Sequence, residues 1–170
     1  KPETWMMADQ RFIDNGDGTV ADTLTNLMWM QEDSFLVLKK FVTYRHAVKL
    51  LEKLNEEAFA GHSDWRFPNK REAHSLFDET KSVKDKYDMD IHIDPVFLPG
   101  CGYDTWTSHT RGKITAYSYS FSSGLGGHKE VDDTLNNSVR FVRGEFDNTR
   151  SKIGAVPQVR DKITQGGGWR

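Results

Sequence analysis

The chain has 170 residues, a formal net charge of −2 at pH 7 and 36% hydrophobic residues, which fits one folded domain with an appendage. The 23 Lys and Arg residues are balanced by 25 Asp and Glu residues, and the basic stripe typical of nucleic-acid-binding domains is missing. No apolar run approaches the ~20 residues of a membrane helix. We therefore expect neither a nucleic-acid partner nor a membrane span.

The first element in chain order is a predicted β-hairpin over residues 11–30, with a buried strand at 27–30. Asn-Gly and Asp-Gly pairs in its turn readily adopt the positive φ values of tight hairpins. Asp14, Asn15 and Asp17 place oxygen atoms at alternating positions, as at the start of a calcium-binding loop. Such a loop also needs a bidentate Glu and flanking helices, and neither follows. Two interpretations stay open: calcium ligands, with calcium as the one candidate cofactor, or side chains that cap their own hairpin.

Two helices are predicted in the middle of the chain. Residues 43–59 carry apolar side chains at helical spacing, behind the N-cap candidate Thr43. A second helix should begin at Asn69, because Asn69 and Glu72 have the spacing of a capping box. The residues between the helices should be extended, since Pro68 disfavours helical geometry at the residue before it.

The second half of the chain is predicted to contain loops and strands. Residues 78–94 are charged and should form an exposed loop. Tyr and Phe side chains at 117, 119 and 121 alternate with Ser, which is typical of a strand, and residues 139–143 alternate in the same way. Large apolar residues should form one core: Trp29, Leu51, Leu54, Trp65, Leu76, Trp106 and Phe141.

Five short motifs in a fixed order resemble one protein family. They are DNGDGTV at 14–20, LMWM at 27–30, GHSDWRFPN at 61–69, YDTWTS at 103–108 and VRFVRG at 139–144. Together they resemble the C-terminal domain of the bacterial collagen-like adhesin Lcl, over residues 11–144. The resemblance implies an α+β, C-type-lectin-like fold with two helices packed on a small irregular antiparallel sheet. It also implies adjacent first and last strands, with long loops from 78 to 138 covering one end.

Two features depart from that family. Its members commonly have a Cys in the first helix and another in the last strand, and the resemblance places Leu51 and Phe141 there, as if a packed pair had replaced a disulfide. Residues 145–170 continue past the point where the family ends. We therefore expect a lectin-like domain at 1–144, followed by an extension, linker or docking arm at 145–170. The calcium- and sugar-binding triplets of true C-type lectins are absent, so calcium-dependent sugar binding is not expected.

The stretch from 99 to 138 is the candidate ligand-binding region. It is rich in Gly, Ser, Thr, Tyr and Asn, a composition typical of adaptable binding loops. Its basic residues would suit sulfate, carboxylate or phosphate groups if folding brings them together. Asp132 and Asp133 lie close enough in sequence to neutralise them, and a solvated loop surface is the alternative. The candidate residues are His109, Arg111, Lys113, Tyr117, His128 and Lys129.

Three functions follow as hypotheses. The resemblance favours a non-catalytic adhesion module, exported or on the cell surface, that binds an anionic glycan or a protein and forms a homo-oligomer. The alternative is an accessory structural subunit of a larger assembly that docks through its C-terminal extension, where Ile153, Val156, Val159 and Ile163 supply apolar surface. An enzyme of the formylglycine-generating type shares the broad lectin-like fold. We expect no enzymatic activity, because Cys101 is the single Cys residue and no positioned base accompanies it.

Overall fold

The computed structural model describes residues 10–133 and 135–157 and has an α+β architecture. Its N-terminal sheet contains β1 (Phe12–Asp14), β2 (Thr19–Asp22), β3 (Leu27–Met30) and β9 (Val142–Arg143), in the order β1-β2-β3-β9. The predicted hairpin is confirmed, and Trp29 pairs with Val20 on one side and with Val142 on the other. The last strand thus lies beside β3, so the expected adjacency of the first and last strands is wrong. The largely buried strand β3 takes a central position, whereas β1, with two exposed residues, forms an edge.

Both predicted helices form, each with its predicted cap. The longer helix, α3 (Tyr44–Glu56), begins after Thr43, whose side chain accepts a hydrogen bond from the backbone N–H of His46. It ends before residue 59, because Ala58 takes a left-handed conformation with φ of 50° and a short 3-10 helix, η1 (Phe59–Gly61), follows. The second helix, α4 (Lys70–Ser75), begins after Asn69, which forms the capping box with Glu72.

A third α-helix, α2 (Ser34–Leu38), was not predicted. Five residues are too few to show helical periodicity. Its one local signal is Asp33, whose carboxylate accepts a hydrogen bond from the backbone N–H of Leu36 and caps the first turn.

The second half of the chain forms two further antiparallel sheets. One contains β6 (Asp104–Arg111), β7 (Thr115–Ser120) and β8 (Gly126–Glu130). The other pairs β4 (Val83–Lys84) with β5 (Asp90–Ile91), so the segment at 78–94 is not entirely an exposed loop, and Val83 and Ile91 are buried. Of the predicted strand at 139–143, only β9 is a regular strand. Residues 137–142 are all buried, so the expected alternation of buried and exposed side chains is not observed.

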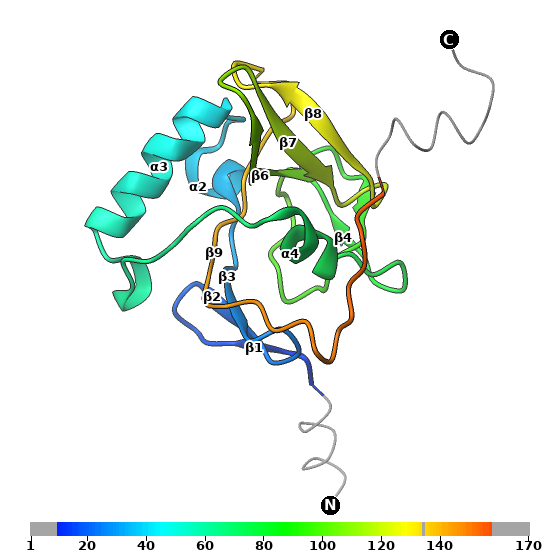
Figure 1. The fold of residues 1–170 in the computed structure, drawn as a ribbon. Coiled ribbons are helices and arrows are strands. Elements are labelled where there is room, and N and C mark those ends of the chain that lie inside the picture. The colour runs from blue at the N-terminus through cyan, green and yellow to red at the C-terminus, as the bar shows by residue number, and fades with distance from the viewer. Residues whose placement is uncertain (1–9, 134, 158–170) are drawn as a thin grey trace, which may run out of the picture.

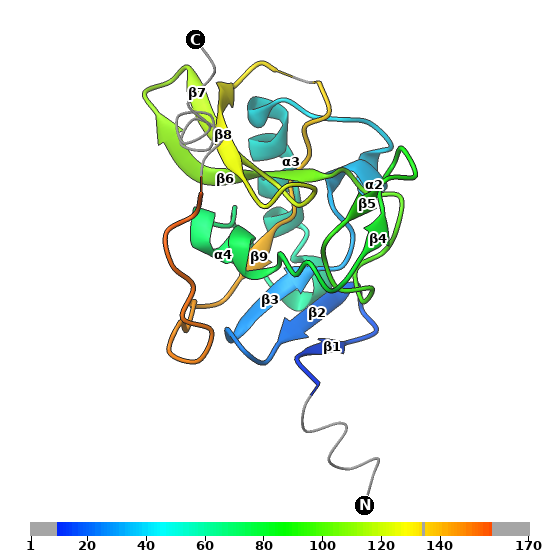
Figure 2. The same ribbon diagram turned by 90° about the vertical axis from the view of Figure 1, so that its right-hand side faces the viewer.

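The elements are arranged around the two larger sheets. The sheet of β6, β7 and β8 lies above the N-terminal sheet, with α3 on one side (Figure 1). Helix α4 packs against β6 and β7, and the view turned by 90° places it beside the sheets, away from β4 and β5 (Figure 2). Across the described ranges, no helix is long and apolar enough to span a bilayer.

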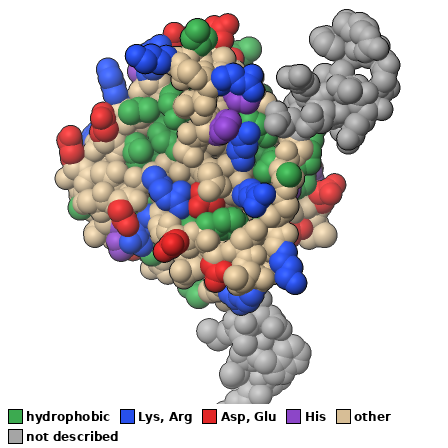
Figure 3. Space-filling model, viewed as in Figure 1, with side chains coloured by type: hydrophobic (Ala, Val, Ile, Leu, Met, Phe, Trp, Pro, Cys, Tyr) green, Lys and Arg blue, Asp and Glu red, His purple; other side chains and the backbone are tan. Residues whose placement is uncertain are grey.

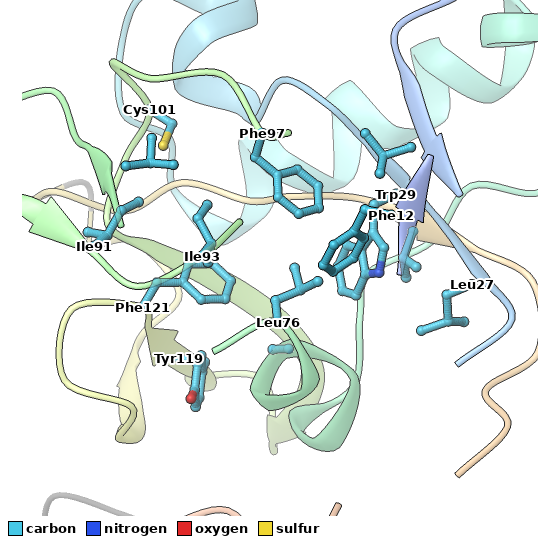
Figure 4. Packing of buried hydrophobic residues seen from close by; sticks show 14 of the residues in the cluster. Phe12, Leu27, Trp29, Leu76, Ile91, Ile93, Phe97, Cys101, Tyr119 and Phe121 are labelled. Atoms are coloured by element: carbon cyan, nitrogen blue, oxygen red, sulfur yellow. The ribbon is translucent and has the colours of Figure 1, made fainter. Parts of the chain in front are cut away.

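The buried side chains form two hydrophobic clusters rather than one. The first contains Trp29 and Leu76 together with Ile93, Phe97 and Phe121, and joins the N-terminal sheet to α4 and the loop after β5 (Figure 4). The second lies under α3 and contains Leu54, Trp65, Trp106 and Phe141, with Leu51 half-buried at its margin. The predicted core residues are thus confirmed as buried, apart from the partial exposure of Leu51.

Arg140 is a buried cation that holds the segment before β9 in place. Its guanidinium donates hydrogen bonds to the carbonyl oxygens of Met30 (3.2 Å) and Gln31 (2.7 Å) and lies 4.9 Å from the centroid of the Phe97 ring. Burial raises the pKa of the Asp33 carboxyl, and the charge of Arg140 opposes that shift. The charge of Arg140 therefore offsets part of the cost of burying the Asp33 carboxylate.

Residues 145–157, the described part of the predicted docking arm, lie against their own domain. The backbone N–H of Asp147 donates to Thr25 O (2.9 Å), and the N–H of Gly126 donates to Pro157 O (3.3 Å). Phe146 and Val156 pack against the first cluster, and the segment runs from the N-terminal sheet up to β8 (Figure 1). Val159 and Ile163 lie outside the described residues.

Candidate functional site

The sheet of β6, β7 and β8 positions the candidate ligand-binding residues. Its register aligns Tyr117 with His128 and Arg111 with Thr115. The pairing of β6 with β7 shifts between Trp106 and Thr110, a bulge of the kind that redirects side chains. The two faces of the sheet consequently carry different groups: Ala116 contributes to the cluster under α3, whereas Tyr117 contributes to the cluster beside α4.

Tyr117 lies at the centre of a group of rings on the α4 side of this sheet. It is fully buried, and its ring centroid lies 6.3 Å from that of His109 and 5.6 Å from that of His128. The two imidazoles are themselves 5.5 Å apart. Folding therefore brings together three of the six predicted residues, from three different strands.

Two further basic residues complete this group. The Nζ atom of Lys70, the first residue of α4, lies 4.4 Å from the centroid of the Tyr117 ring, which is a cation–π contact. The start of α4 is tied to β6 because Ser108 N donates to Pro68 O at 2.8 Å. Arg111 is exposed at the end of β6. We call Lys70, His109, Arg111 and His128, gathered around Tyr117, the basic cluster.

The basic side chains of the cluster repel one another. Burial lowers the pKa of Lys70, and the charge of Arg111 lowers it further. Burial likewise lowers the pKa values of His109 and His128, with further lowering by Lys70 and Arg111. A bound anion would relieve this repulsion and favour the protonated histidines.

No carboxylate among the described residues forms an ion pair with Lys70 or Arg111. Glu130 follows His128 by two residues, which places it on the same face of β8, but it is exposed and forms no ion pair with the cluster. Histidine side chains lie beside Lys and Arg side chains on the surface over β7, β8 and α4 (Figure 3). The cluster is thus a basic surface without a partner of opposite charge in the described chain.

Lys129 does not join the basic cluster. It follows His128 directly and so points to the opposite face of β8. Its Nζ atom contacts Asp104 Oδ2 at 3.3 Å and donates to Asn137 Oδ1 at 2.8 Å. Asp104 is fully buried, and burial raises its pKa to about 6. The Lys129 ammonium group therefore stabilises the buried Asp104 carboxyl within the domain.

Lys113 also lies away from the basic cluster. It occupies the turn between β6 and β7 and borders a groove on the side of the sheet that faces α3. Lys70, by contrast, belongs to the cluster although it was not predicted as a site residue. Its contact with Tyr117 joins positions 47 residues apart, and we find no local sequence signal for it.

The sequence model of the Lcl C-terminal domain family matches residues 18–143, which is more than half of the chain. The chain belongs to this family. Comparisons with curated proteins and with solved structures gave no significant match. The basic cluster lies entirely within the Lcl C-terminal domain, whereas the segment at 145–157 lies beyond it.

The hairpin of β1 and β2, whose turn directly precedes the matched range, uses its polar side chains to cap its own turn. Asp14 Oδ1 accepts from Gly16 N (2.9 Å), and Asp17 Oδ1 accepts from the backbone and side chain of Thr19 (3.1 and 2.6 Å). Asn15 donates to the Thr19 hydroxyl at 2.9 Å. These contacts match the alternative interpretation of the motif. Calcium binding there stays a prediction, and no group of three His, Cys, Asp or Glu side chains suited to a metal occurs in the described ranges.

The single cysteine of the Lcl C-terminal domain is not exposed. Cys101 is fully buried in the first cluster, and burial raises the pKa of its thiol to about 11. At neutral pH the side chain is a thiol rather than a thiolate, which is the nucleophilic form.

Proposed function

We propose that this Lcl C-terminal domain is a non-catalytic adhesion module that binds anionic groups, on a glycan or on a protein surface, at the basic cluster. The observation that carries the proposal is the convergence of Lys70, His109, Arg111 and His128 around Tyr117, with no acidic partner among the residues that the structure describes. Sulfate and carboxylate groups are the natural complement of such a surface.

The chemistry of the cluster favours recognition over catalysis. Tyr117 is held rigidly inside the domain and supports the groups packed around its ring, while Lys70 and Arg111 supply positive charge at the surface. The buried Cys101 thiol lacks the exposure and low pKa that a cysteine nucleophile needs. A C-type-lectin-like classification and an exported location are parts of the same proposal. Homo-oligomers would repeat the cluster and raise the avidity for a polyanion.

Heparin, a sulfated polysaccharide, is the probe for the test. We expect the double variant Lys70→Ala/Arg111→Ala to bind heparin about tenfold or more weakly, since each lost charge-assisted contact is worth about 1 kcal/mol. Calorimetry at low salt would measure the affinity, and raising the salt should weaken binding by the parent domain because screening shortens the range of the attraction.

The matched control is Lys40→Ala, which removes one exposed positive charge far from the cluster in sequence and outside it in the structure. This variant should bind heparin as the parent domain does. Unchanged affinity of a folded Lys70→Ala/Arg111→Ala variant, with the fold verified by circular dichroism, would exclude the basic cluster as the binding site.

A further inference from the structure

A groove between α3 and the tip of the β6–β7 hairpin lies on the opposite side of the sheet from the basic cluster. Its volume is about 420 Å³, and the residues that the argument uses are Tyr44, Val48, Lys49, Glu52, Lys113 and Val131. Hydrophobic side chains gather at the surface between α3 and this hairpin (Figure 3). Pockets for small organic ligands typically measure ~300–1,000 Å³.

The floor of the groove is apolar and preformed. The Tyr44 ring packs against Phe67 (4.9 Å between centroids) and edge-on against Trp106 (5.5 Å), which fixes its position. The backbone N–H of Tyr44 donates to Val131 O at 2.9 Å, so the helix start and the far wall are joined directly. A ligand that enters would find the surface already formed and would not need to order it.

The rim of the groove is predominantly basic. Lys49 and Lys113 are exposed on opposite sides, and in the described part of the chain neither forms an ion pair. Arg45 forms an ion pair with Asp132 at 2.9 Å, and Glu52 is the one acidic side chain among the described residues that line the groove. An apolar floor between two unpaired ammonium groups fits a compact apolar body that carries an anionic group.

We infer that this groove binds a small amphipathic organic anion, an aromatic or aliphatic body with one carboxylate or sulfonate. The body lies on Tyr44, Val48 and Val131, and the anionic group lies between Lys49 and Lys113. This site is independent of the basic cluster, because Thr110 lines the groove while the neighbouring His109 and Arg111 belong to the other face of β6.

The test uses 4-phenylbutyrate as the probe, with 4-phenylbutanol and acetate as probes that keep only the body or only the charge. In two-dimensional NMR titrations, 4-phenylbutyrate should shift the signals of α3 and the β6–β7 turn saturably, and either partial probe should bind at least about fivefold more weakly. Absence of saturable shifts up to about 10 mM 4-phenylbutyrate would overturn the inference.

Charge removal distinguishes this groove from other surfaces. Lys49→Met/Lys113→Met keeps the aliphatic stems of two exposed residues and should weaken 4-phenylbutyrate binding about fivefold, whereas Lys40→Met should leave it unchanged. Equal binding by the double variant, equal binding of 4-phenylbutanol, or shifts confined to other elements would each contradict the inference. The Lys70→Ala/Arg111→Ala variant should retain 4-phenylbutyrate binding, so this site and the proposed anion-binding site can fail separately.

Discussion

Replacing Gly126 by alanine should destabilise the domain by displacing Tyr117. An added Cβ atom at Gly126 would lie 2.3 Å from the Tyr117 Oη atom and 2.4 Å from two ring carbons, whereas carbon atoms in contact are normally ~3.5–4.0 Å apart. The Tyr117 ring is fully buried, so its packed neighbours would have to shift together with it. Overpacking of this kind costs about 1–3 kcal/mol.

A loss of about 2 kcal/mol corresponds to a fall in Tm of about 4–8 °C for a domain of this size. Chemical denaturation followed by tryptophan fluorescence would measure the free energy of unfolding. Heparin affinity of the Gly126→Ala variant should also fall, although no charge is removed, because Tyr117 positions Lys70, His109 and His128.

The neighbouring glycine is the matched control. A Cβ atom at Gly127 meets no heavy atom within 4 Å, and neither glycine needs a positive φ. Gly127→Ala should therefore be neutral or stabilising by about 0.5 kcal/mol, through reduced freedom of the unfolded chain. Equal stability of the Gly126→Ala and Gly127→Ala variants would refute the view that Tyr117 is held rigidly.

Three further results are expected. Arg140→Met should lower the free energy of unfolding, measured by chemical denaturation, by about 3–5 kcal/mol, because the buried Asp33 loses its compensating charge. A free energy of unfolding equal to that of the parent domain would contradict this. Burial raises the pKa of Asp104 from 3.8 to about 6, so its carboxyl should titrate near that value by NMR. The folded state then binds this proton more tightly than the unfolded chain does. The free energy of unfolding contributed by Asp104 should therefore fall as pH rises from about 4 to 6. Because burial and the neighbouring charges of Lys70 and Arg111 lower the pKa values of His109 and His128, heparin affinity should increase as the pH falls through the acidic range in which these imidazoles become protonated, and a flat pH profile would exclude their participation.

Sequence reasoning succeeded where a signal was local or periodic. Thr43 and Asn69 cap their helices because a cap needs only the next three residues. The tryptophans at 29, 65 and 106 are buried, as expected of large rings within apolar motifs. The short helix α2 was missed because a single capping residue, Asp33, is its only local signal.

The candidate site depends on contacts between residues that lie far apart in the sequence. The contact of Lys70 with Tyr117 depends on how α4 docks on the sheet, which no local pattern specifies. The separation of Lys129 from His128, in contrast, follows from strand alternation and was available once a strand at 126–130 was assumed. The burial of Arg140 was not predicted, because nothing in its local sequence indicates the charge interaction with the buried Asp33.

Direct mapping of a bound oligosaccharide tests the central claim best. Titration of the isotope-labelled domain with a heparin-derived tetrasaccharide, followed by NMR, would report which residues it contacts. We expect the largest shifts at Lys70, His109, Arg111 and His128, together with the ring signals of Tyr117. Shifts concentrated on α3, on the N-terminal sheet or on residues 145–157 would contradict the assignment of anion binding to the basic cluster, as would the absence of any saturable shift.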